Sequence, residues 1–270
     1  MAEPGSIFSR GLAWLERYGP RLSNAVRHDV KQRYAGSFLG TLWAVLYPLC
    51  LLSFYATIYV VIFKVRVPDL TPATYTVLVM SGLSAIIMFA ESLSNGLTVI
   101  AGQRALLLNT VFPAELIPPR SVLASQVPSL SALLITAIIG SSLGSASPIA
   151  LIIVPLTWIL LIMFMTGLVW IVSLLALVIR DIQQIVGIVN MAAMVLSPMA
   201  YTPEMVPPQL KLILWCNPLT YFVLCLQAPL AMNSWPPAVG MIGASVLGIG
   251  TFFIGLAFFR RARFAFVDYA

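Results

Sequence analysis

The sequence has few charged residues. Only 9% of its 270 residues are charged, 15 Lys or Arg and nine Asp or Glu, against about 25% in ordinary soluble domains. Hydrophobic residues make up 60% of the chain, and its mean hydropathy is +0.97. So few charges cannot shield this much apolar surface from water. The composition excludes a soluble globular domain and predicts an all-α integral membrane protein.

Residues that carry chemistry are scarce as well. The chain has one histidine, His28, and none of its three lysines lies in the G-x-x-x-x-G-K-[ST] loop that cradles ATP phosphates. Its three cysteines form no C-x-x-C pair, and a single acid, Glu91, lies deep within an apolar run. These absences argue against a metal site and against acid–base catalysis. We therefore expect a chain that is not an enzyme and holds no cofactor of its own.

Long apolar runs predict six transmembrane helices. About 20 residues are needed to cross the hydrocarbon core of a bilayer. Charged residues and prolines separate the runs, and the predicted spans are residues 38–63, 74–100, 121–143, 149–179, 185–200 and 239–259.

The segment 201–237 is apolar but interrupted. Lys211, Asn217-Pro218, Gln227 and Pro229 make it unsuitable for lipid, and broken helices are tolerated only beside protein or a watery cavity. We predict a re-entrant helix pair on the outer side, between the fifth and sixth spans. The residues expected to form an outer gate beside a pore are Tyr201, Pro203, Glu204, Asn217 and Pro218.

The first 37 residues form a basic region ahead of the transmembrane domain, residues 38–270. Between Arg21 and Tyr34 the apolar side chains share one side of a helical wheel, whereas Arg27 and Lys31 lie on the other. This pattern predicts an amphipathic helix lying in the membrane interface; the alternative is a disordered basic tail.

The basic residues also predict the orientation. With six spans and both termini cytoplasmic, only Lys64, Arg66 and Lys211 lie outside. Basic residues placed beside spans orient the chain in the membrane, so no nucleic-acid partner is expected.

Several stretches carry ordered motifs. The first runs from Asp29 to Pro48 and the second, V-F-P-A-E-L-I-P, from Val111 to Pro118; shorter ones are residues 180–182, 201–207 and 217–220. Together they resemble the membrane (permease) subunits of bacterial ABC polysaccharide exporters, the group that handles O-antigen, capsule and teichoic acid. His28 and Ala114 stand where that family has arginines.

The resemblance implies partners and a substrate. It implies a homodimer of six-span subunits in the bacterial cytoplasmic (inner) membrane, paired with two copies of an ATP-binding subunit that holds ATP and Mg. The exported molecule would be a glycan linked to undecaprenyl diphosphate, with O-antigen for lipopolysaccharide favoured over capsule or teichoic acid precursors. A related exporter of drugs or lipids, a channel, a secondary carrier and a non-transport membrane enzyme or scaffold are the alternatives.

Three groups of residues are the candidate sites. The ATPase-coupling loop comprises Arg104, Leu107, Asn109, Phe112, Pro113 and Glu115. Arg27, Lys31 and Arg33 are expected to attract lipid headgroups or the substrate's diphosphate. The aromatic candidates for a pore lining are Trp43, Tyr47, Phe54, Tyr55 and Tyr59. Glu91 is expected to face the bundle or the dimer interface, where a hydrogen bond to a Ser or Thr of a neighbouring helix is favoured and contact with substrate is the alternative.

Overall fold

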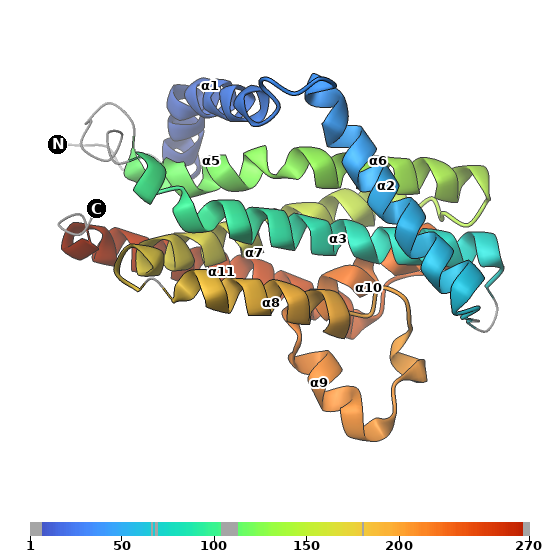
Figure 1. Cartoon of the computed structure of the whole chain (residues 1–270). Coiled ribbons are helices and arrows are strands. Elements are labelled where there is room, and N and C mark those ends of the chain that lie inside the picture. Colours follow the sequence, from blue (N-terminus) through green and yellow to red (C-terminus); the bar gives the residue numbers. More distant parts are fainter. Residues whose placement is uncertain (1–6, 66, 68–69, 104–112, 180, 267–270) are drawn as a thin grey trace.

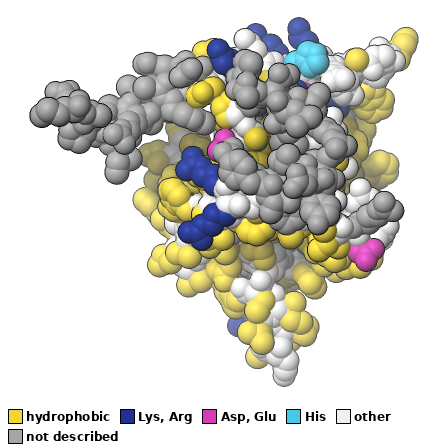
Figure 2. Space-filling view, turned by 90° about the vertical axis from the view of Figure 1, so that its left-hand side faces the viewer, with side chains coloured by type: hydrophobic (Ala, Val, Ile, Leu, Met, Phe, Trp, Pro, Cys, Tyr) yellow, Lys and Arg dark blue, Asp and Glu magenta, His cyan; other side chains and the backbone are white. Residues whose placement is uncertain are grey.

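The computed structural model describes residues 7–65, 67, 70–103, 113–179 and 181–266, and this part of the chain contains helices and no strands. Its long helices run side by side as a bundle, with the start of α1 and the end of α11 at the same end (Figure 1). Arg21, Arg27, Lys31, Arg260 and Arg261 are exposed on these two helices. We call this end the basic end; Figure 2 views it directly and shows its Lys and Arg side chains.

Helix α3 (Pro72–Thr98) forms the centre of the bundle and is buried along most of its length. Pro72 occupies its first turn, and the Thr71 hydroxyl caps it by accepting a hydrogen bond from the Thr74 N–H at 3.2 Å. The helices packed against it include α2 (Trp43–Ala56), α6 (Gln126–Ser142), α7 (Ala150–Val178) and α10 (Pro218–Ala231).

Helix α1 (Ile7–Arg33) confirms the predicted amphipathic helix, although it begins well before the expected Arg21. Pro20 lies inside the helix. In its second half the apolar side chains are half-buried against the bundle, whereas Arg27 and Lys31 are exposed. The helix lies beside α5 (Ile117–Ala124), outside the central bundle (Figure 1).

Five helical segments within the described ranges are long and apolar enough to cross a membrane: Gly40–Ile62, Pro72–Thr98, Ala114–Ser142, Ala150–Val178 and Ala238–Ala262. The first continues from α2 into a π-helical turn, Thr57–Ile62, and the third joins the short η4 (Ala114–Leu116) to α5 and α6. The last belongs to α11 (Ala238–Phe266).

The predicted fifth span is a shorter helix than expected. Helix α8 (Ile182–Leu196) has 15 residues and ends before residue 200. At 1.5 Å per residue it is about 22 Å long, less than the roughly 30 Å of a hydrocarbon core. Pro198 explains the early end, because the residue before a proline is pushed out of the helical region, and Ser197 is extended (φ −79°, ψ 142°).

Helices α9 (Lys211–Cys216) and α10 are bent by 96° at Asn217, as the predicted break requires. This geometry fits either a broken span or a re-entrant pair. The two halves differ in surroundings: α10 is almost entirely buried in the bundle, whereas α9 projects from its side (Figure 1). Two short turns, Pro203–Met205 and Pro208–Leu210, precede α9.

Glycines allow α7 and α11 to pack very closely. A Cβ at Gly167 would lie 2.2 Å from the carbonyl oxygen of Thr251, and one at Gly255 would lie 2.3 Å from that of Gly167. Small residues at such crossings let two membrane helices approach backbone to backbone, where van der Waals contact is greatest. This crossing therefore tolerates no side chain.

We expect Gly167→Val to destabilise the protein by about 1–3 kcal/mol, the usual cost of overpacking a tight core. Thermal unfolding of the detergent-solubilised protein, followed by size-exclusion chromatography, measures the effect. Gly250→Val is the matched control, because no atom lies within 4 Å of a Cβ at that position of α11. Equal unfolding temperatures for the two variants would contradict the close crossing.

Candidate functional site

A cavity of about 470 Å³ lies where α1 meets α2, α3 and α6, and we call it the polar pocket. The residues lining it come from all four helices and from the α1–α2 turn: Arg33, Tyr34, Ser37, Trp43, Tyr47, Glu91, Asn95 and Pro128. It thus brings together one of the predicted phosphate-attracting arginines and two of the predicted pore aromatics. Burial raises the pKa of Tyr34. A tyrosine hydroxyl is protonated at neutral pH in any case and can donate a hydrogen bond.

Two glycines shape the α1–α2 turn, which contributes Ser37 to the lining of the polar pocket. Gly36 (φ +78°) and Gly40 (φ +53°) adopt left-handed backbone conformations that side chains disfavour. Between them the Ser37 hydroxyl donates to the Tyr34 carbonyl at 3.0 Å. The turn redirects the chain from α1 into α2 and brings Tyr34 and Trp43 to the same cavity.

Glu91 forms an ion pair with Arg33, the last residue of α1. Its Oε2 accepts a hydrogen bond from Arg33 Nη1 at 2.9 Å, and each side chain is a little over a quarter exposed. The Asn95 amide donates to the Glu91 backbone carbonyl (2.6 Å), to Glu91 Oε2 (3.3 Å) and to Ser125 Oγ (3.0 Å). Glu91 faces the bundle as predicted, but its partners are an arginine and an asparagine rather than a hydroxyl.

A second ion pair joins α1 to α5. Arg120 Nε donates to Asp29 Oδ2 at 2.5 Å, and Arg120 Nη2 donates to Asp29 Oδ1, so the guanidinium and carboxylate meet through two parallel bonds. Their side chains are 13% and 22% exposed. Such two-point pairs fix orientation as well as distance. The Asp29–Arg120 pair therefore holds α1 against the start of the third span.

Reversing one charge should release α1. We expect Arg120→Asp to lower the unfolding temperature and to expose α1 to limited proteolysis, because two carboxylates would then face each other. Breaking a fully buried pair costs about 3–5 kcal/mol, an upper bound for this partly exposed one. The double variant Asp29→Arg/Arg120→Asp should recover most of the loss, and a double variant no better than the single one would contradict the pairing.

Most of the predicted coupling loop, including Arg104, Leu107, Asn109 and Phe112, lies outside the described residues. Pro113 and Glu115 lie within them, at the start of the third span. The Trp170 indole N–H donates to the Glu115 carbonyl at 3.0 Å, and the Glu115 carboxylate lies 3.9 Å from Arg260 Nε. The end of the loop is thus attached to both α7 and α11.

The aromatic side chains that were predicted to line a pore lie in different surroundings. Trp43 and Tyr47 line the polar pocket, whereas Phe54 lines a separate cavity of about 310 Å³ on α2. Tyr55 and Tyr59 stack on each other, with ring centroids 6.3 Å apart, and pack against the core. The structure does not bring the five side chains to one surface of the protomer.

At the predicted outer gate, the polar groups hold the fold. Asn217 Oδ1 caps α10 by accepting from the Leu219 N–H at 3.0 Å, and its Nδ2 donates to Ser197 Oγ at 2.9 Å. The Tyr201 hydroxyl donates to the Leu196 carbonyl at 2.8 Å. Pro203 begins a short turn, Glu204 is exposed, and Pro218 opens α10.

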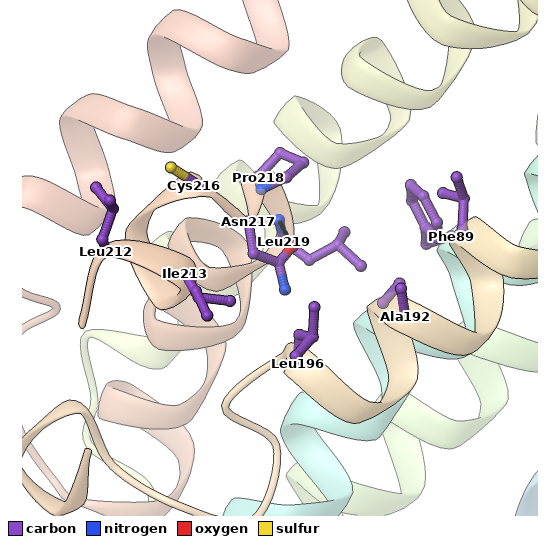
Figure 3. A pocket seen from close by; sticks show the side chains of 11 residues that line it. Phe89, Ala192, Leu196, Leu212, Ile213, Cys216, Asn217, Pro218 and Leu219 are labelled. Carbon is purple, nitrogen blue, oxygen red and sulfur yellow. Dashed lines mark hydrogen bonds between the residues drawn. The ribbon is translucent and has the colours of Figure 1, made fainter. Parts of the chain in front are cut away.

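An apolar cavity of about 420 Å³ lies beside these residues. Figure 3 shows Leu212 and Ile213 of α9 facing Ala192 and Leu196 of α8, with Asn217 between them. Because both ends of the Asn217 amide are already bonded, the lining offers little to a sugar or a phosphate.

Gln227, whose polarity marks the segment 201–237 as unsuitable for lipid, is surrounded by protein. Its side chain is only 1% exposed, and its Nε2 contacts the carbonyl oxygens of Pro198 (2.8 Å), Met199 (3.2 Å) and Leu78 (3.3 Å). The Tyr75 hydroxyl donates to the next carbonyl, that of Ala200, at 2.8 Å. An amide suits a pore and a cluster of backbone carbonyls equally well, so its sequence position alone did not distinguish them. Gln227 instead fastens the end of α8 to α3 and α10.

Gln227→Met should destabilise the bundle, because it keeps the volume but leaves buried carbonyls without a donor, at a cost of about 1–3 kcal/mol. The unfolding temperature measures this loss. Gln209→Met is a matched control on an exposed turn. If both variants unfold at the same temperature, Gln227 does not fasten α8.

The fold and these contacts define a multi-pass helical membrane protein, with a polar pocket and a helix outside the bundle at its basic end. Comparison with known families agrees, and the chain belongs to the ABC-2 type transporter family, whose model matches residues 22–230. It is therefore the membrane subunit of an ABC transporter, with a role in transport, and this family works with an ATP-binding subunit.

Curated relatives cover nearly the whole chain. An O-antigen export system permease protein RfbA from Klebsiella pneumoniae is 28% identical over 244 residues, which are 89% of this chain and 91% of the relative. A protein of the same name from Myxococcus xanthus is 23% identical over 256 residues, 94% of this chain and 96% of the relative. A second one from Klebsiella pneumoniae is 28% identical over 249 residues, with coverage of 89% and 91%.

Proposed function

We propose that this chain is the permease subunit of an ATP-driven exporter that moves O-antigen, linked to undecaprenyl diphosphate, across the bacterial cytoplasmic membrane. The observation that carries the proposal is the similarity, over about nine-tenths of the chain, to three relatives named as O-antigen export permeases. The ABC-2 family match supports the same class of transporter. Permeases for capsule or teichoic acid, or for a drug or lipid, are the alternatives, and the relatives' names favour O-antigen.

The energy for export would come from a partner. The sequence has no phosphate-binding loop, so ATP and Mg would be held by a separate ATP-binding subunit, two copies of which would serve a homodimer of this chain. The basic end would be cytoplasmic, because basic residues concentrate on the inner side of membrane proteins. The loop ending at Pro113 and Glu115 would then face the ATP-binding subunit.

The contacts of Glu115 suggest how movement is passed on. A displacement of the loop would also displace α7 and α11, because Trp170 of α7 and Arg260 of α11 both contact Glu115. The same segment leads into α5, which the Asp29–Arg120 pair joins to α1. Helix α1 and two membrane helices would therefore move with the ATP-binding subunit.

The lining of the polar pocket suits the sugars nearest to the diphosphate of the substrate. Sugars present C–H faces that pack on aromatic rings and hydroxyls that exchange hydrogen bonds. Trp43 and Tyr47 offer such rings, and Ser37 and Asn95 offer polar groups in the same cavity. A lining of this kind binds a polymer weakly enough for it to slide onward.

A complementation experiment tests the function. A Klebsiella pneumoniae strain lacking its O-antigen permease would receive this chain together with the ATP-binding subunit from the same organism as the chain. We expect O-antigen to reappear on lipopolysaccharide at the cell surface, detected by immunoblot. The control is the same pair in a strain that lacks its capsule permease. Restored capsule without restored O-antigen would contradict the proposal.

A further inference from the structure

We propose that the Arg33–Glu91 ion pair is exchangeable, and that the diphosphate head group of the transported molecule enters the polar pocket by displacing Glu91 from Arg33. This inference rests on the proposed function for the identity of the ligand. It assigns the recognition of that head group to one ion pair, whereas the sequence suggested three equivalent cations.

The Asp29–Arg120 and Arg33–Glu91 ion pairs differ in how firmly they hold α1. Asp29 and Arg33 lie one helical turn apart, and each reaches a different partner helix. Asp29 and Arg120 share two bonds and are 22% and 13% exposed, whereas Arg33 and Glu91 share one bond and are 27% and 28% exposed. A singly bonded, partly exposed pair contributes little stability. Displacing Glu91 would therefore cost little, while α1 stays attached to α5.

A diphosphate is the better ligand for the Arg33 guanidinium. The planar fork of an arginine binds two oxygens of a phosphate through parallel N–H···O bonds, and such bonds are stronger when both groups are charged. Glu91 offers Arg33 one oxygen and a single negative charge. A diphosphate offers several oxygens and a larger charge, so it competes favourably for the same donors.

The polar pocket also accommodates the displaced carboxylate. Asn95 Nδ2 lies 3.3 Å from Glu91 Oε2 and would keep donating to it after Arg33 turned away. The hydroxyl of Tyr34, in the lining beside Arg33, can donate to an anion in the cavity, whereas the Ser37 hydroxyl already donates to the Tyr34 carbonyl. Trp43 and Tyr47 lie in the same lining, so a first sugar attached to the diphosphate would meet their rings.

Binding of inorganic pyrophosphate to the purified full-length chain in phosphatidylcholine nanodiscs tests the exchange. Glu91→Gln removes the competing charge and should tighten binding about fivefold, since an exposed ion pair is worth roughly that factor. Arg33→Gln should weaken binding at least as much, and adding Glu91→Gln to it should restore nothing. Asp181→Asn is the matched control, because it removes an exposed carboxylate that does not line the polar pocket.

A second variant and a second ligand provide further tests of the exchange. If Glu91→Gln fails to yield a monodisperse protein, Arg33→Lys replaces it, and it should bind less tightly than wild type because it keeps the charge without the fork. Geranyl diphosphate should bind at least as well as pyrophosphate and show the same dependence on Glu91. Suppression of both by phosphatidylglycerol in the nanodiscs would identify lipid phosphate as the ligand and overturn the assignment.

Unchanged pyrophosphate affinity in Glu91→Gln and Arg33→Gln would also overturn the exchange. The complementation experiment separates this failure from a failure of the proposed function. Restored O-antigen with unchanged binding would reject the exchange alone, whereas the expected binding shifts without restored O-antigen would reject the substrate and leave the anion exchange in place.

Discussion

A polar side chain inside a lipid-embedded bundle must find its partner within the protein, and this constraint organises both ends of α3. Toward the basic end, Glu91 and Asn95 draw in α1 and the start of α6. Toward the other end, the Tyr75 hydroxyl donates to the carbonyl of Ala200, just after α8. There the backbone carbonyl of Leu78 accepts from the Gln227 amide of α10. The central helix is thus tied to its surroundings by a few directional bonds, and apolar packing fills the space between them.

The polar pocket is a consequence of the first of these ties. Arg33 ends α1 and pairs with Glu91 of α3, and the turn at Gly36 then sends the chain into α2, which supplies Trp43 and Tyr47 to the same cavity. The arrangement places a cation, hydroxyls and aromatic rings in one cavity on a protein of the ABC-2 type transporter family. Helix α1 contributes to this cavity and is joined by the Asp29–Arg120 pair to α5, which follows the predicted coupling loop. In the proposed mechanism, α1 therefore connects the substrate to the ATP-binding subunit.

The sequence predicted the apolar helices well, because the length of an uncharged run and the residues that end it are local properties. The break at Asn217-Pro218 was predictable for the same reason. The tertiary partners of the polar side chains were not predictable from the sequence. Arg33 and Glu91 are 58 positions apart, and either could have faced lipid headgroups or another helix. For Gln227 the sequence left protein and a watery cavity open as surroundings, because polarity alone does not distinguish backbone carbonyls from water.

The central claim is that the head group of the substrate lies in the polar pocket at the basic end of the bundle. Photo-crosslinking tests it most directly, with benzoylphenylalanine in place of Tyr47 or, in a separate protein, of Leu212 in the apolar cavity beside α9. Both proteins would be assembled with the ATP-binding subunit in nanodiscs that contain radiolabelled undecaprenyl-diphosphate-linked glycan. The account predicts labelling from position 47 that excess pyrophosphate suppresses, and little from position 212. Strong labelling from position 212 with none from position 47 would contradict it.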